Sequence, residues 1–236
     1  MHRREAVVAA LTLTGALRAG ADDFAPRRRR MMADVAAMAR ETGTPIGERV
    51  MAVLGSLPRH EFVPAEQVSN AYQNRPLPIG HGQTISQPYI VALMTELARL
   101  QPDHRVLEVG TGSGYQAAVA AQVAREVYTI EIVEPLGQQA TQRLQRLGHP
   151  NVQVRLGDGY HGWEEHAPYD AILVTAAASH VPPPLVRQLK AGGRMVVPVG
   201  APFMVQQLML VEKRADGSVS TRQILPVAFV PLTGQR

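Results

Sequence analysis

The chain contains no cysteine among its 236 residues. Disulfide bonds, thiolate metal sites and a cysteine nucleophile are therefore excluded. The sequence also lacks an apolar run of the ~18 residues that a membrane-spanning helix needs. Its eight histidines are scattered and lack the spacing of metal ligands, so we expect no metal site. The length and the apolar content of 45% suit one α/β domain with an extension.

The positive charge of the chain is concentrated at its N-terminus. The net charge is +4, and residues 1–40 hold eight arginines and four acidic residues, so the charges of residues 41–236 cancel. A neutral body argues against nucleic-acid binding, which depends on a basic surface. We expect the basic segment to be a solvated arm, in which Arg27–Arg30 form the flexible approach to the first helix.

The first residues resemble a weak export signal. Arg3 and Arg4 precede a mostly apolar stretch, Ala6–Leu17, and Ala19-Gly20-Ala21 resembles a small-residue cleavage site. The paired arginines also fit a twin-arginine signal. Charged residues at positions 5 and 18 interrupt the pattern, so an added amphipathic segment is an equal alternative.

The functional domain is predicted to span residues 31–236, with residues 1–30 as a flexible or signal-like extension. Apolar residues at three- and four-residue intervals predict helices over 31–40 and 46–54. Pro88, tolerated in a first turn, opens a predicted helix that runs to about residue 100. Residues 58–88 are rich in Pro, Gly, Gln and Asn and are predicted to be a loop. A loop of that length within a domain is usually functional.

From residue 105 onward, predicted strands and helices alternate. The strands are expected at 105–109, 127–130, 152–156, 169–174 and 194–199, and the helices at 113–124, 135–147 and 182–190. Such alternation predicts an α/β, Rossmann-like fold with a mostly parallel sheet and helices on both faces. Strands at 207–213 and 222–230 have no helix between them, and Ala215-Asp216-Gly217 predicts the turn of a C-terminal antiparallel hairpin.

A glycine-rich loop, Gly110-Thr111-Gly112-Ser113-Gly114, joins the first of these strands to the next helix. The dinucleotide fingerprint is G-x-G-x-x-G, and the spacing here differs from it by one residue. A nucleoside cofactor without phosphate also needs the tight turn, and it needs acidic side chains near its cationic groups. Glu108, two residues before the loop, suits the ammonium group of a methionine moiety.

Acidic residues also follow the next two strands. Glu131 ends the second strand, where a carboxylate can accept both ribose hydroxyls, in NAD enzymes as in methyltransferases. Asp158 lies between Gly157 and Gly159 after the third strand, where it can accept from an adenine amino group. An ordinary Asp-Gly turn explains that tripeptide equally well. Three such signals at successive strand ends favour a nucleoside site.

Ser86 precedes the helix predicted to open at Pro88. It occupies the place of a helix N-cap, and the alternative is a hydroxyl that faces the cofactor cleft. A serine nucleophile would need an adjacent base. His81 is near in sequence, but no G-x-S-x-G elbow is present, which disfavours a hydrolase.

Several segments together resemble the protein-L-isoaspartate O-methyltransferase family. They are Leu77–Gly80, Gln83–Tyr89, Leu107–Tyr115, Gly157–Gly159, Pro168–Ile172, Ala191–Arg194, Pro198–Gly200 and Phe229–Leu232. The stretch Gln-Thr-Ile-Ser-Gln-Pro-Tyr at 83–89 is the narrowest of them, since the glycine loop marks only methyltransferases in general. The resemblance begins near Met31 and runs to the C-terminus.

The resemblance implies methyl transfer from S-adenosyl-L-methionine to the free α-carboxylate of L-isoaspartyl and D-aspartyl residues in damaged proteins, which begins their repair. It implies Ser86 as the catalytic residue. The cofactor-binding positions it implies are Gln83, Thr84, Glu108, Gly110, Gly112, Gly114, Glu131, Asp158, Gly159 and Thr233.

The expected partners are isoaspartyl-containing proteins and peptides, without nucleic acid or membrane, and the expected state is a monomer. Because S-adenosylmethionine is cytosolic, we expect a cytoplasmic protein, with export as the alternative. Three other functions stay open on the residues alone. They are methylation of a small molecule or RNA, NAD-dependent oxidoreduction, and a non-catalytic exported binding protein.

Overall fold

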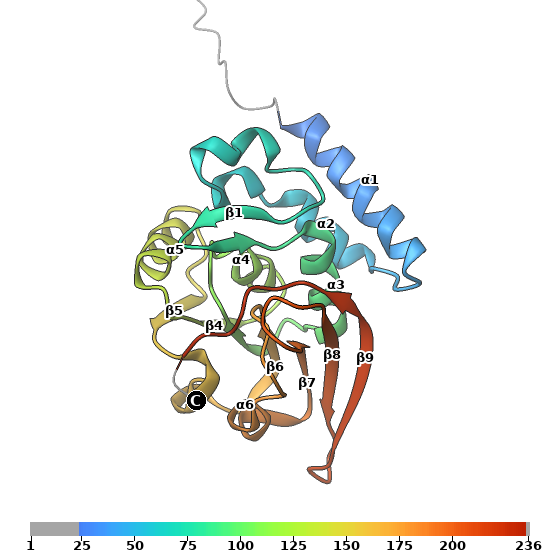
Figure 1. Ribbon diagram of the computed structural model, residues 1–236, viewed down its shortest axis with the longest axis vertical. Helices are drawn as coiled ribbons and strands as arrows, with labels where there is room; N and C mark the ends of the chain where they lie inside the picture. The colour runs from blue at the N-terminus through green and yellow to red at the C-terminus, as the bar shows by residue number, and fades with distance from the viewer. Residues whose placement is uncertain (1–23, 235–236) are drawn as a thin grey trace, which may run out of the picture.

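The computed structural model describes residues 24–234, and a seven-stranded sheet forms their centre (Figure 1). The strand order is β5-β4-β3-β6-β7-β8-β9. The strands are β3 (Arg105–Val109), β4 (Glu126–Glu131), β5 (Val152–Leu156), β6 (Tyr169–Val174), β7 (Leu189–Val199), β8 (Gln206–Lys213) and β9 (Val219–Val227). Strands β3 to β7 pair in parallel, and β8 runs antiparallel to both of its neighbours. The predicted mostly parallel sheet with a C-terminal antiparallel hairpin is confirmed.

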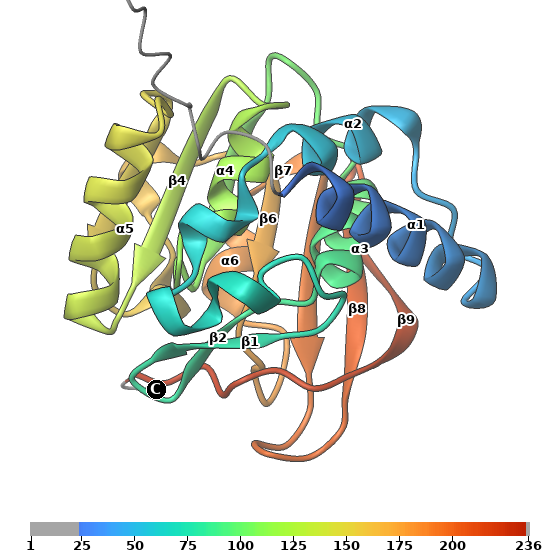
Figure 2. The same cartoon turned by 90° about the horizontal axis from the view of Figure 1, so that it is seen from above.

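Helices cover both faces of this sheet, as predicted (Figure 2). Successive strand residues point to opposite faces, so Val106 of β3 belongs to one apolar core and Leu107 to the other. The first core packs under α1 (Ala25–Glu41), α2 (Glu48–Ser56), α3 (Pro88–Ala98), α4 (Tyr115–Ala121) and α5 (Glu134–Arg146). The second packs under α6 (Pro183–Gln188). In the described part of the chain, no helix is long and apolar enough to cross a membrane.

Helix α1 begins six residues before the predicted helix, at Ala25. The prediction that Arg27–Arg30 are a flexible approach is therefore wrong, because all four arginines are helical. Pro26 fits the first turn of a helix, and Met31 and Val35, four residues apart, are buried against the domain. Before the helix, Phe24 stacks on His60 with ring centroids 4.0 Å apart. The signal-like residues 1–21 lie outside the described residues.

The segment predicted as a loop over residues 58–88 contains regular structure. Two 3₁₀ turns, η1 (Arg59–Phe62) and η2 (Ala65–Asn70), are followed by the antiparallel ribbon of β1 (Leu77–Gly80) and β2 (Gln83–Ile85). The strands are too short, and the segment too rich in turn residues, for periodicity to predict them. In Figures 1 and 2 this ribbon lies beside the C-terminal segment that follows β9.

Several other boundaries differ from the prediction, among them those of α4 (Tyr115–Ala121, predicted 113–124) and β7 (Leu189–Val199, predicted 194–199). Helix α6 ends at Gln188 instead of 190, because Leu189 already pairs with Tyr169 at the start of β7. Strand β9 ends at Val227, so residues 228–234 are free to cross the end of the sheet. That crossing segment becomes part of the site.

Candidate active site

A cleft lies at the carboxyl ends of β3, β4 and β6, where open α/β sheets bind their ligands. It encloses about 740 Å³ between protein atoms, part of it open to solvent. The ribbon β1–β2 contributes Gln83, Thr84, Ile85 and Ser86, and the C-terminal segment contributes residues 230–233. The cleft is thus built from segments more than a hundred residues apart in sequence.

Two of the three glycines of the glycine loop line the cleft. Gly110 and Gly112 line it, both with positive φ. A Cβ at Gly110 would lie 2.5 Å from Oγ1 of Thr175, and this hydroxyl donates to the Gly110 carbonyl at 2.6 Å. The loop and the end of β6 therefore approach too closely for a side chain at Gly110.

Gly114, the third glycine, does not line the cleft. It faces α5, where a Cβ would lie 3.2 Å from Cδ1 of Leu144 and 3.6 Å from the Cβ of Ala140. The structure thus places this predicted cofactor residue in helix packing. Spacing alone cannot separate the two roles, because every glycine of the triplet takes a positive φ.

Substituting Gly114 with alanine tests this packing role. At φ 85° and with Leu144 in close contact, Gly114→Ala is expected to destabilise the fold by ~1–3 kcal/mol. The dissociation constant of S-adenosylhomocysteine for the folded fraction should change less than about twofold. Urea unfolding and isothermal titration measure the two effects. A large loss of affinity without loss of stability would indicate that Gly114 is a cofactor-binding residue.

Glu108 is fully buried beneath the glycine loop. Its Oε2 accepts a hydrogen bond from the Thr129 hydroxyl at 2.5 Å. The Thr129 hydroxyl also lies within hydrogen-bond distance, 2.7 Å, of the Thr111 hydroxyl. Its Oε1 is buried without a partner among the described residues. Burial raises the pKa of Glu108 to about 8, and the Glu131 carboxylate adds a smaller increase, while the Thr129 hydrogen bond lowers it.

The raised pKa makes a prediction about pH. The unfolded chain releases this proton near its ordinary pKa and the folded chain holds it up to about 8. The free energy of unfolding therefore falls as the pH rises through this window, by at most ~1.4 kcal/mol per pH unit. Glu108→Gln removes the titration, so its melting temperature relative to the parent should rise between pH 5 and pH 8.5. Equal differences at both pH values would contradict the assignment.

Glu131 is held in place by two backbone amides. Oε2 accepts from the Gly112 N–H at 2.7 Å, and Oε1 accepts from the Val133 N–H at 2.9 Å. Glu131 is buried, and it lines the cleft. Each carboxylate oxygen keeps a second lone pair, so the side chain can still accept from two hydroxyl groups of a ligand.

Asp158 stands behind the cleft wall, which is formed by its neighbour Gly159. Oδ1 accepts from the Tyr160 N–H at 2.9 Å, and Oδ2 is buried without a partner among the described residues. Gly234 of the C-terminal segment lies so close that a side chain there would collide with this carboxylate. One oxygen of Asp158 is thus an unsatisfied acceptor under the end of the chain.

Ser86 lines both this cleft and a second, adjoining groove. The N-cap of α3 is Gln87 and makes no side-chain cap hydrogen bond, so Ser86 does not cap the helix. Its carbonyl accepts from Nη2 of Arg59 at 2.7 Å. The second groove is lined largely by apolar residues at the end of β9 and the start of the C-terminal segment, Pro226–Val230. It shares Thr84, Thr175 and Val230 with the cleft.

The structure also brings residues to the cleft that the predicted site residues did not include. They include Thr111, Ser113, Tyr115, Gln116, Ile132 and Val133, in addition to Thr233, which was expected there. Thr175, whose turn with Ala176 and Ala177 was a candidate wall of the substrate groove, lines the cleft as well. Ile132 and Thr175 directly follow the ends of β4 and β6, a position that could have identified them. Among residues 24–234, no group of three or more His, Asp or Glu residues is arranged to hold a metal ion.

The family model for protein-L-isoaspartate(D-aspartate) O-methyltransferase matches residues 31–236. The chain belongs to this family. It is 80% identical over 211 residues to protein-L-isoaspartate O-methyltransferase 2 of Polaromonas sp. (strain JS666), covering 87% of this chain and 100% of that protein. It is 63% identical to protein-L-isoaspartate O-methyltransferase 1 of Cupriavidus necator, covering 96% of this chain and 89% of the relative.

Solved structures of the same family share the fold. A protein-L-isoaspartate O-methyltransferase superposes with a TM-score of 0.78 at 31% identity, covering 88% of this chain and 66% of that one. A putative protein-L-isoaspartate O-methyltransferase from Plasmodium falciparum, in complex with S-adenosyl-L-homocysteine, has a TM-score of 0.71 at 25% identity. It covers 85% of this chain and 97% of that chain. The resemblance read from the sequence is confirmed at the level of family and fold.

Proposed function

We propose that the chain, as a member of this family, transfers the methyl group of S-adenosylmethionine to the free α-carboxylate of L-isoaspartyl and D-aspartyl residues in damaged proteins. The observation that carries this proposal is that Glu108, Glu131 and Ser86 meet around one cleft. The Glu131 carboxylate suits a cationic nucleoside, and so does Glu108, because a bound ammonium group would lower the pKa of Glu108 and favour its ionised form. A serine hydroxyl can donate to an anionic oxygen. The complex of the Plasmodium relative with S-adenosyl-L-homocysteine supports the choice of cofactor.

Unsatisfied acceptors support the fit of this cofactor. Oε1 of Glu108 and Oδ2 of Asp158 are both buried without a partner in the described chain. A buried acceptor left unpaired costs ~1–3 kcal/mol, and a bound donor would recover it. The cofactor offers an ammonium group, two ribose hydroxyls and an adenine amino group, to which we assign Glu108, Glu131 and Asp158. The remaining proposed contacts are Gln83, Thr84, Gly110, Gly112, Gly159 and Thr233.

The mechanism requires positioning more than acid–base chemistry. S-adenosylmethionine supplies an electrophilic methyl group on a sulfonium sulfur. The substrate carboxylate, with an ordinary pKa of ~4, is already ionised at neutral pH, so no residue has to act as a base. Ser86 donates a hydrogen bond to one carboxylate oxygen and leaves the other free to attack. Alignment of the reacting atoms can supply up to ~7–11 kcal/mol.

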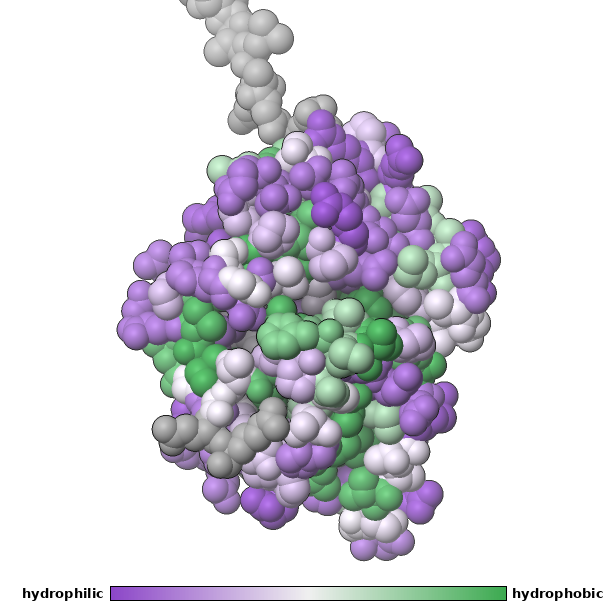
Figure 3. Space-filling view, viewed as in Figure 1, coloured by the Kyte–Doolittle hydropathy of each residue, from purple (hydrophilic) through white to green (hydrophobic). Residues whose placement is uncertain are grey.

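The second groove is the proposed path of the substrate polypeptide. It meets the cleft at Ser86, and its rim includes Val205. Val205 belongs to an exposed apolar loop together with Phe203 and Met204. Their exposed fractions are 88% for Phe203, 65% for Met204 and 68% for Val205. Figure 3 shows apolar side chains gathered near the middle of this face. An extended chain with little sequence selectivity can bind such a surface through its backbone and apolar flanks.

A methyl-transfer assay tests the proposed function. Radiolabelled methyl should pass from S-adenosylmethionine to a peptide with one L-isoaspartyl residue, and not to the same peptide with a normal aspartyl residue. The ester is expected to close to a succinimide, which hydrolyses partly to aspartate, so the outcome is repair. Label in RNA, or a melting shift with NAD in place of S-adenosylhomocysteine, would favour the alternative functions.

The setting of this reaction is also a proposal. A cytosolic cofactor favours a cytoplasmic protein, with export as the alternative. Because the cleft and groove are completed within one chain, we propose that a monomer is sufficient for activity. Partners are then isoaspartyl proteins and peptides, without nucleic acid.

A further inference from the structure

Arg59 is a fully buried arginine directly behind the catalytic cleft. It opens η1 and is 0% exposed. Its Nε donates to the carbonyl of Ala71 at 2.9 Å, and its Nη2 donates to the carbonyl of Ser86 at 2.7 Å. The guanidinium lies 4.7 Å from the ring centroid of Tyr115, a residue of the cleft wall. One side chain therefore ties the loop after α2, the end of η2 and the segment before α3.

The charge of Arg59 has no acidic partner. None of the ion pairs formed by the described residues includes it, and its Nη1 is buried without a hydrogen-bond partner. Burial lowers the pKa of Arg59 to about 10, so it remains charged at neutral pH. A buried, unpaired charge is destabilising, and an apolar side chain could fill the same space without that cost. Its presence behind the cleft points to a role in the site.

We infer that Arg59 is a positioning residue for methyl transfer, which acts by holding the peptide unit of Ser86. Ser86 lines the junction of cleft and groove and is not the N-cap of α3, so no capping hydrogen bond fixes the direction of its hydroxyl. A charge-assisted hydrogen bond to the Ser86 carbonyl is stronger than a neutral one, and it comes from a side chain locked by burial. This inference rests on the proposed function and adds a second residue to it.

A double-mutant cycle separates this role from a structural one. Arg59→Met is expected to lower kcat for an isoaspartyl peptide by about 10- to 100-fold, with the dissociation constant of S-adenosylhomocysteine within about twofold of the parent. In the Ser86→Ala background the same substitution should cost less than about threefold, because the hydroxyl that Arg59 positions through the residue 86 carbonyl is already absent. Arg59→Lys keeps a cation and should recover part of the loss.

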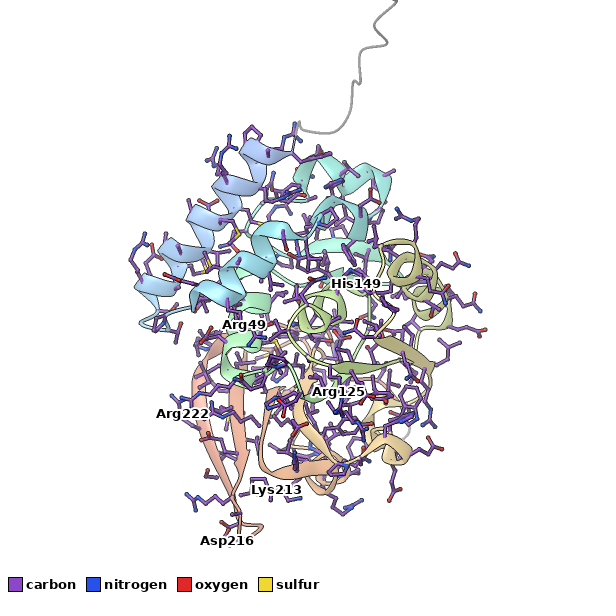
Figure 4. All side chains as sticks on the ribbon, turned by 180° about the vertical axis from the view of Figure 1, so that it is seen from behind. Arg49, Arg125, His149, Lys213, Asp216 and Arg222 are labelled. Carbon is purple, nitrogen blue, oxygen red and sulfur yellow. The ribbon has the colours of Figure 1, made fainter. Side chains whose placement is uncertain are left out.

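Arg49 provides the matched control (Figure 4). It also joins distant segments, since its Nη2 donates to the carbonyl of Val123 at 3.2 Å, and no hydrogen bond among the described residues joins it to Ser86. Arg49→Met should change kcat less than about twofold in either background. If Arg59→Met does not fold, the cycle is run with Arg59→Lys, which loses the planar fork that bonds two carbonyls.

Equal losses in the two backgrounds, or a loss of cofactor affinity as large as the loss of kcat, would overturn the inference. An inactive parent protein would instead overturn the proposed function, so the two failures are distinguishable.

Discussion

Replacing Ser86 with alanine is expected to reduce kcat for an isoaspartyl peptide by about 10²- to 10³-fold, the usual effect of losing one donor to a reacting oxygen. Ser86 lines the junction of cleft and groove and is not the N-cap of α3, so loss of its hydroxyl should remove orientation of the carboxylate and little else. The dissociation constant of S-adenosylhomocysteine should stay within about twofold of the parent. Single-turnover methyl transfer and isothermal titration measure these two quantities.

The matched control for this substitution is Ser56→Ala on α2, outside the cleft. Among residues 24–234, the Ser56 hydroxyl donates to the Val53 carbonyl alone, at 2.8 Å. This variant should keep full turnover. If Ser86→Ala weakened cofactor binding as much as turnover, Ser86 would be a structural residue of the cleft and not a catalytic one.

Glu131→Ala should raise the dissociation constant of S-adenosylhomocysteine by about 10²-fold or more. Each hydrogen bond to a charged acceptor contributes ~1.5–3 kcal/mol, and the two ribose hydroxyls would lose theirs together. The substitution also frees the N–H groups of Gly112 and Val133, which loosens the glycine loop. Isothermal titration gives the affinity, and thermal unfolding gives the separate cost to the fold.

Glu134→Ala controls for the loss of negative charge near the cleft. Glu134 is exposed at the start of α5, three residues beyond Glu131, and accepts only from Gln138 at 2.9 Å. Its removal should change the affinity less than about twofold. A similar loss in both variants would mean that Glu131 acts through the general field of the protein and makes no direct contact.

The sheet and the site were predictable wherever a local pattern carries the information. Short apolar strands that alternate with helices predicted β3 to β7, and the acid at the end of β4 predicted the position of Glu131 in the cleft. The start of α1 was missed because four consecutive arginines resemble a solvated arm. The four arginines are helical because they precede Met31 and Val35 in the same helix, and these two residues pack against the domain.

Other features depend on contacts between distant residues. Arg59 reaches the carbonyls of residues 12 and 27 positions away, and nothing in its local sequence marks it. Gly110 and Gly114 belong to the same glycine triplet and both have a positive φ. Gly110 nevertheless faces Thr175, whereas Gly114 faces Leu144. Which surface a glycine meets is decided by the packing of α5 and β6, which the sequence spacing does not encode.

A crystal structure with S-adenosylhomocysteine and an isoaspartyl peptide would test the proposed alignment of cofactor and substrate. We expect the Glu131 carboxylate to accept from both ribose hydroxyls, and the Ser86 hydroxyl to donate to the peptide carboxylate on the side of the cofactor sulfur. A peptide whose carboxylate lies away from Ser86, or a cofactor bound outside the cleft formed by β3, β4 and β6, would contradict it.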